Sequence, residues 1–273
     1  MLGKLIKNEF IQTSKSLITV YAAAGVTILF MLLSYVTDIT WIGVTGSSVL
    51  ILIGFAAIIM TLVMIVNNFA RSLYGNQGYL SYTLPVKCSS LLFSKFIVSF
   101  AWIILGYVVM FLTILIVILY AKARSNGILE SVFDMVRELE IISNLPTMKS
   151  IISYLVVTGL GSIITVVSLL SFIFFAITVA NTRMFQHKPT LFGLVFFFLA
   201  YFVNKTVATS LTYSFPLSIV ATSESIGIQA ISMANAEGVL FIQGIGGKIF
   251  TVIFSAVLLF ITGWIMEKRV NVK

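Results

Sequence analysis

Long apolar stretches without a charged side chain are the feature that most constrains how this chain folds. A helix needs about 20 such residues to cross a hydrocarbon core about 30 Å thick. Six spans are predicted, at residues 17–36, 41–66, 96–120, 151–180, 190–205 and 249–266. Membrane strands would alternate apolar and polar residues, whereas these runs are continuous. The predicted fold class is therefore an all-α integral membrane protein with six transmembrane helices.

The composition supports a membrane protein. Of the 273 residues, 59% are hydrophobic and 10% are charged, whereas an ordinary soluble domain has about 25% charged residues. The net charge of +8 does not indicate nucleic-acid binding, because the basic residues are scattered between apolar blocks and form no basic patch. Residues 1–273 are predicted to form a single transmembrane domain whose surroundings are the lipid bilayer.

The positions of Lys and Arg predict the orientation. Eleven of the 17 basic residues fall on the side of the two termini, five fall on the other side, and Lys205 ends the fifth span. Because Lys and Arg favour the cytoplasmic side, both termini are predicted to be cytoplasmic in a multi-pass protein of the plasma membrane. Lys205 would lie near the outer interface, where its ammonium either reaches toward water or contacts a substrate.

Residues 1–16 are predicted to form an amphipathic helix in the membrane interface. Its apolar face carries Leu2, Leu5, Ile6 and Phe10, and lysines lie on the opposite face. Glu9 falls on the apolar face, which is unusual for a simple anchor. Two interpretations are open: Glu9 tips toward water, or it pairs with a cation of a neighbouring helix or partner.

Two segments on the predicted outer side are longer than turns. Residues 206–248 are apolar but are interrupted by Pro216 and by several glycines. This pattern predicts short re-entrant or interfacial helices packed against the other spans. Residues 121–150 include apolar side chains at helical spacing, which predicts an amphipathic helix on the outer surface.

No catalytic or metal site is predicted. Ionisable groups at membrane depth mark functional sites, and the first four spans and the sixth contain none. The only histidine, His187, and the only cysteine, Cys88, have no ligating neighbours at the spacing of a metal site. The glycines before Lys248 do not match a phosphate-binding loop, because Ile249 stands where Ser or Thr is needed. The chain is therefore predicted not to be an enzyme.

The most informative segment is the predicted cytoplasmic connection, residues 67–95. It contains a turn signal at residues 75–78, a second break at Pro85, and a cluster of apolar and aromatic side chains. The members of this cluster are Leu73, Tyr74, Tyr79, Leu80, Tyr82 and Leu84. Such a cluster in a cytoplasmic loop is typical of a docking surface. The alternative is that it folds back against the membrane interface.

This segment, R-x-x-Y-G-x-x-G-Y-L-x-x-T-L-P from Arg71 to Pro85, resembles the ABC-2-type transporter permeases of the Gly-Tyr-Leu variety. The six spans and the N-terminal sequence K-N-E-F are similar as well. The resemblance implies that residues 67–95 form a coupling loop that inserts into a cytosolic ATP-binding subunit. ATP and Mg²⁺ would bind to that subunit, so no cofactor is expected in this chain. It also implies that two permease copies, identical or different, form the pathway.

The predicted function is a permease subunit that exports a hydrophobic or amphipathic cargo such as a small peptide. The residues expected to couple it to the ATPase are Tyr74, Gly75, Gly78, Tyr79, Leu80, Leu84 and Pro85. Glu9 and Lys205 are candidates for an interface or the substrate path. The alternatives are a membrane scaffold or immunity protein without transport, an ion-coupled secondary transporter, and an intramembrane enzyme.

Overall fold

The computed structural model describes residues 2–37, 40–75, 78, 88–124, 148–185, 187–215, 217–221, 226–229 and 241–268. Most of these residues are helical. The helices are α1 (Leu2–Thr37), α2 (Thr40–Tyr74), α4 (Cys88–Arg124), α7 (Met148–Ala180), α8 (Pro189–Ser214) and α9 (Gly246–Lys268). Within this part of the chain, α2, α4, α7, α8 and α9 contain five segments long and apolar enough to cross a membrane. The fold is therefore that of a predominantly helical, multi-pass membrane protein.

Helix α1 is bent. Its segments Gly3–Lys15 and Leu17–Phe30 differ in direction by 48°, and together they would make a further span. The bend lies at the boundary where the predicted interfacial helix meets the first predicted span. Polar Thr13 and Ser14 hydrogen-bond to carbonyl oxygens of their own helix just before the bend, a pattern that often bends helices.

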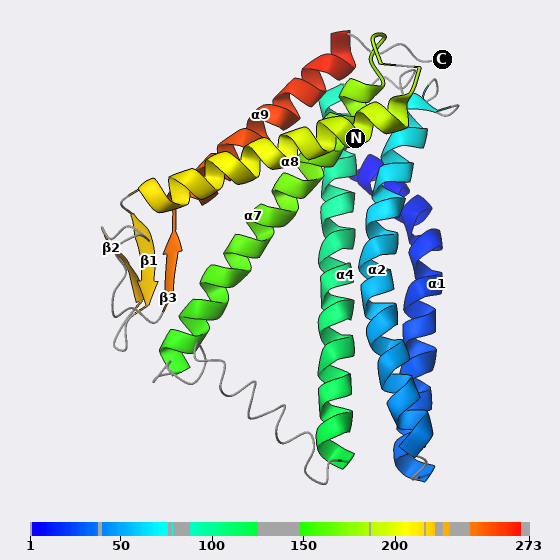
Figure 1. The fold of residues 1–273 in the computed structure, drawn as a ribbon. Coiled ribbons are helices and arrows are strands. Elements are labelled where there is room, and N and C mark those ends of the chain that lie inside the picture. The colour runs from blue at the N-terminus through cyan, green and yellow to red at the C-terminus, as the bar shows by residue number, and fades with distance from the viewer. Residues whose placement is uncertain are drawn as a thin grey trace. The chain divides into compact units, whose positions relative to one another are not determined.

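The helices fall into two compact units. Unit 1 consists of α1, α2 and α4, each of which contacts the other two (Figure 1). Its apolar core is the cluster of Leu17, Val98 and Trp102, with Ile6, Tyr21 and Met64 packed around it. Glycine allows close approach within this unit, since a Cβ added at Gly54 of α2 would lie 2.6 Å from Thr113 Oγ1 of α4.

Unit 2 consists of α7, α8, α9 and a small sheet, with the three helices in mutual contact (Figure 1). The buried core of Phe172, Ala200 and Leu258 is surrounded by further phenylalanines. The strands are β1 (Ser218–Ala221), β2 (Ile226–Gln229) and β3 (Phe241–Gly244), in the order β2-β1-β3. Both pairings are antiparallel, and Ser218 lies opposite Gln229 on one side and Gly244 on the other.

The prediction of re-entrant or interfacial helices at residues 206–248 is wrong for the residues that the structure describes there. Helix α8 continues to Ser214, and three strands follow it. Short apolar runs do not distinguish helix from strand by periodicity, and the β-branched side chains in β1 and β2 favour the pleated form. Lys205 consequently lies inside α8, where it is exposed, and not at the end of the fifth helix.

The predicted limits of the 67–95 connection are also wrong. Residues 67–74 complete α2 and residues 88–95 begin α4, which leaves 75–87 between the two helices. Helices continue beyond the hydrocarbon layer, so the end of an apolar run is not the end of a helix. Gly75 ends α2: its N–H donates to the Arg71 carbonyl oxygen at 3.2 Å, and an added Cβ would lie 2.7 Å from that oxygen.

Several predicted positions lie outside the described residues. In the connection these are Tyr79, Leu80, Tyr82, Leu84 and Pro85, whereas Gly75 and Gly78 are described. The predicted outer amphipathic helix also falls largely on residues outside the description, since α4 ends at Arg124 and α7 begins at Met148.

Candidate functional site: a buried ion pair at the meeting point of α1, α2 and α4

A buried ion pair joins the three helices of unit 1. Lys95 Nζ of α4 lies 2.5 Å from Glu9 Oε1 of α1, and the two side chains are 2% and 15% exposed. The second carboxylate oxygen, Glu9 Oε2, accepts a hydrogen bond from Asn68 Nδ2 of α2 at 3.0 Å. One carboxylate is therefore held by a partner from each of the other two helices.

The chain order explains why these three side chains meet. Asn68 lies in the last two turns of α2, and Lys95 lies in the first turns of α4. Because these helices pack against each other on either side of the 75–87 connection, the two positions come to the same end of unit 1. Glu9 reaches them from the N-terminal segment of α1. The ion pair thus lies where α2 ends and α4 begins.

A second polar contact joins α1 and α4 beyond the ion pair. Trp102 Nε1 donates to Thr13 Oγ1 at 2.8 Å, and the Thr13 hydroxyl donates to the Glu9 carbonyl oxygen at 2.8 Å. The Phe10 ring stacks on Trp102 with centroids 4.6 Å apart. Thr13 follows Glu9 by one turn and Trp102 follows Lys95 by two, so both contacts lie on the same helix faces.

This arrangement is suited to holding helices together. Removing one partner of a buried ion pair leaves an uncompensated charge, which costs about 3–5 kcal/mol. The three helix ends are therefore expected to move as one body. Among the described residues no group of His, Cys, Asp and Glu side chains could hold a metal ion.

The predicted site residues are distributed differently from the sequence-based expectation. Glu9 pairs with a cation of a neighbouring helix, which is the second of its two interpretations. Leu73 is completely buried within unit 1, so its assignment to an exposed docking cluster is wrong. Tyr74 is half-buried and packs edge-on against Phe69 at 6.2 Å between centroids. The buried Gly78 donates its N–H to the Gly75 carbonyl oxygen at 2.8 Å.

Sequence reasoning missed Lys95, Asn68, Thr13 and Trp102. A signal for the ion pair was present, because Glu9 stood alone on an apolar face and Lys95 stood directly before an apolar span. On the predicted topology both belong to the cytoplasmic side. Opposite charges that border apolar segments on the same side of a membrane are natural partners, since neither is readily buried alone.

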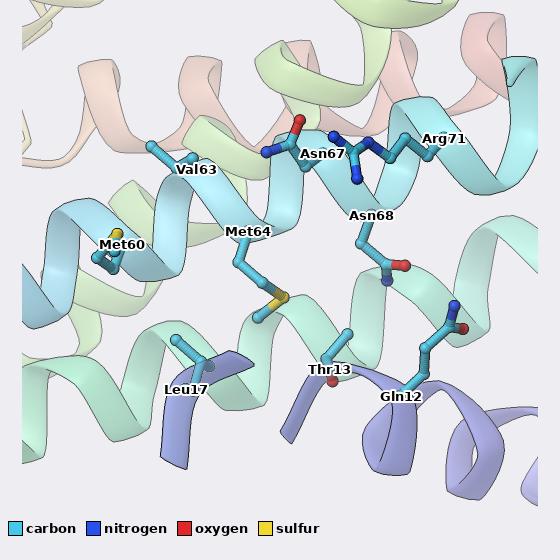
Figure 2. Close-up of a pocket in the computed structure, with 9 residues that line it drawn as sticks. All are labelled: Gln12, Thr13, Leu17, Met60, Val63, Met64, Asn67, Asn68 and Arg71. Atoms are coloured by element: carbon cyan, nitrogen blue, oxygen red, sulfur yellow. The ribbon is translucent and has the colours of Figure 1, made fainter. Parts of the chain in front are cut away.

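Helices α1 and α2 also line an open cavity of about 360 Å³ next to the ion pair (Figure 2). Its polar end is lined by Gln12, Thr13, Asn67, Asn68 and Arg71, and its apolar end by Leu17, Met60, Val63 and Met64. Figure 2 shows Met64 and Asn68 pointing from α2 toward α1, and Gln12 pointing back toward α2. The two ends of the cavity therefore differ in chemistry.

Comparison of the chain with family models, with curated proteins and with solved structures gives no match. Its function is therefore inferred from its own sequence pattern and from the geometry of unit 1.

Proposed function

We propose that this chain is the membrane-spanning permease subunit of an ATP-driven transporter of the ABC-2 type. It would cross the plasma membrane six times with both termini in the cytoplasm, and pair with a second permease copy. Residues 75–87 would contact a cytosolic ATP-binding subunit. The observation that carries the proposal is the network of Glu9, Lys95 and Asn68 at the helix ends that flank this connection.

A connection that transmits movement from the ATP-binding subunit to the spans must be flanked by helices that are held rigidly together. Driving a two-state equilibrium from 1:99 to 99:1 takes about 5.5 kcal/mol of differential binding. If separation of the flanking helices cost less free energy than this, movement of the loop would deform unit 1 and would not reorient the spans. A buried ion pair that ties α4 to α1, with Asn68 of α2 on the same carboxylate, provides this support.

The sequence of the connection fits a docking role. Tyr79, Leu80 and Leu84 would supply aromatic and aliphatic anchors, the residue types that dominate binding energy in buried interfaces. Tyr74 and Gly75 end α2 and set where the connection begins.

The predicted spans favour an ATP-driven transporter over an ion-coupled one. Ion-coupled transporters usually place an acidic residue near the bilayer midplane, and the six spans contain no Asp or Glu. The pathway would be lined by apolar side chains, so a hydrophobic or amphipathic cargo such as a small peptide fits it better than an ion or a sugar. Outward movement of this cargo is the proposed direction.

The coupling role is tested by Leu80→Asp in the full-length protein. The unchanged protein, purified from its own membranes in mild detergent, should bring an ATP-binding subunit with it. Leu80→Asp should insert normally but lose that subunit and transport, because a carboxylate would be buried in the apolar contact. Met184→Asp is the matched control, since Met184 is 80% exposed in another connection on the predicted cytoplasmic side.

Two results would contradict the proposal. If Leu80→Asp retained the ATP-binding subunit, residues 75–87 would not be the contact. If no ATPase accompanied the unchanged protein, a scaffold or immunity protein without transport would be favoured.

The orientation has a separate test in Cys88, the only thiol of the chain. A membrane-impermeant thiol reagent should leave Cys88 unlabelled in intact cells and label it in inside-out vesicles. Cys88→Ser, which has no thiol, gives the background. Labelling in intact cells would place the start of α4 on the outer side and would refute the coupling role.

A further inference from the structure

We propose that the cavity between α1 and α2 binds a phospholipid of net negative charge, with the headgroup phosphate at Arg71 and an acyl chain along Met60 and Met64. This site is independent of the proposed transport function. It depends only on the position of α1 and α2 in a membrane.

The cavity is divided into an apolar end and a polar end. Side chains of α2 that line the cavity change from apolar to polar along the helix: Met60, Val63 and Met64 come first, then Asn67, Asn68 and Arg71 (Figure 2). The same change occurs along α1 in reverse order, from Gln12 to Leu17. A ligand that fills the cavity must therefore itself be amphipathic.

The two ends of the cavity also correspond to different depths in a membrane. The residues of α2 at both ends of the cavity belong to the candidate membrane segment Gly43–Tyr74, and Leu17 at the apolar end begins the segment Leu17–Phe30 of α1. The α2 residues of the polar end, Asn67, Asn68 and Arg71, lie in the last two turns of that segment, where Arg71 is exposed. The change from apolar to polar lining thus follows the change from acyl chains to headgroups in a bilayer. A phospholipid could therefore occupy the cavity in the same orientation that it has in the bilayer.

The charges around the cavity favour an anionic ligand. Glu9 and Lys95 neutralise each other beside the cavity, and no Asp or Glu lines it. Arg71 forms no salt bridge with a described residue, which leaves one net positive charge at the polar end. A guanidinium presents paired N–H groups that match phosphate oxygens. Basic pockets between membrane helices bind anionic headgroups in this way.

The size also fits such a ligand. A cavity of about 360 Å³ lies within the range of about 300–1,000 Å³ of small-molecule sites. It has room for a headgroup and the first part of one chain, while the rest of the lipid remains in the bilayer. Gln12 and Asn67 carry amide groups at the polar end that can donate to the phosphate or glycerol oxygens.

The experiment measures lipid binding to the full-length protein by native mass spectrometry, with phosphatidylglycerol and phosphatidylcholine added separately to the delipidated protein. We expect one phosphatidylglycerol per chain to bind about tenfold more tightly than phosphatidylcholine. Arg71→Gln should abolish this preference, and Arg71→Lys should keep part of it. Arg183→Gln, which removes an exposed arginine from the turn after α7 in unit 2, should leave it unchanged.

A second pair of measurements separates a lipid site from a phosphate site. Val63→Trp, which fills the apolar end, should weaken phosphatidylglycerol binding by about tenfold or more. Inorganic phosphate should not displace the lipid at equal concentration. Equal binding of the two lipids, an unchanged preference in Arg71→Gln, or full displacement by inorganic phosphate would each overturn the proposal. The proposal would also be overturned if a second copy of the chain, and not a lipid, covered the cavity.

Discussion

Units 1 and 2 are both built from three mutually packed helices, but their closest contacts use different side chains. In unit 1, polar contacts add to the apolar core: Glu9 binds Lys95 and Asn68, and Trp102 hydrogen-bonds to Thr13. In unit 2 the helices meet through clustered phenylalanines and through glycines of α9 that lie against the α8 backbone.

The two units hold their helices together in different ways, in surroundings where burial of apolar side chains contributes little free energy. Apolar side chains gain little by leaving lipid for each other, so association depends on polar bonds or on close packing of small residues. Unit 1 combines an apolar core with a few directional polar contacts, and the loss of one of these contacts should be costly. In unit 2 the glycines of α9 lie against the α8 backbone, so its weak points should be where backbones approach closely.

The largest effect is expected for Lys95→Met in unit 1. It would leave the Glu9 carboxylate buried without its cation and lower the free energy of unfolding by about 3–5 kcal/mol. Denaturant unfolding in detergent micelles measures this, and Glu9→Gln combined with Lys95→Met should recover much of the loss.

The control for this change is Lys248→Met in unit 2. Among the described residues, Lys248 Nζ contacts only the Gly161 carbonyl oxygen, at 3.5 Å, so a loss below about 1 kcal/mol is expected. Equal losses for the two lysines would mean that the buried pair does not distinguish unit 1.

The next effect in size is expected for Gly247→Ala in unit 2. The added Cβ would overlap Thr212 Oγ1 and the carbonyl oxygen of Ala208, and the α8 backbone cannot yield without moving away from α9. Overpacking of this kind costs about 1–3 kcal/mol, measurable by the same unfolding experiment. Gly159→Ala in α7, where no atom lies within 4 Å of the added Cβ, should be neutral or slightly stabilising because alanine favours helix.

A smaller effect is expected for Trp102→Phe in unit 1. It keeps a ring against Phe10 but removes the hydrogen bond to Thr13, at a cost of about 1 kcal/mol. Thr13→Val removes the same bond from the other side. In a double-mutant cycle, Thr13→Val should lower the free energy of unfolding less in the Trp102→Phe variant than in the unchanged protein. Strictly additive losses would argue against the hydrogen bond as a stabilising contact.

The smallest effect is expected for Gly54→Ala in unit 1. The obstacle is Thr113 Oγ1, 2.6 Å from the added Cβ, and a side chain can rotate where a backbone cannot. The loss should stay below about 1 kcal/mol, and Thr113→Ala should remove it. If Gly54→Ala destabilised as much as Gly247→Ala, close backbone approach would be equally strict in both units.

The positions of the helices could be predicted from the sequence, whereas several of their ends could not. Every predicted span falls within a described helix, because a long apolar run has few other structures available to it. Helix α8 passes Lys205 and α2 passes Asn67, since helices continue where the apolar run stops. The strands after Ser214 were missed because four-residue apolar runs carry no distinguishing period.

Half of the ion pair could be anticipated. Glu9 was conspicuous as an acid on an apolar face, but its partner could not be named, because several cations border the predicted spans. The cavity had no sequence signal at all. It requires Gln12 and Arg71 to face the same space from two helices, which no spacing within one helix reveals.

The sequence by itself determined that this chain forms long apolar helices suited to a membrane, because each uninterrupted apolar run must satisfy its backbone hydrogen bonds internally. It also placed single charges at the borders of those runs. Only the tertiary structure decided that Glu9 binds Lys95 and Asn68, and that Arg71 closes the polar end of a cavity. The physical reason is that each of these contacts joins different helices, so it depends on how helix faces are oriented in space.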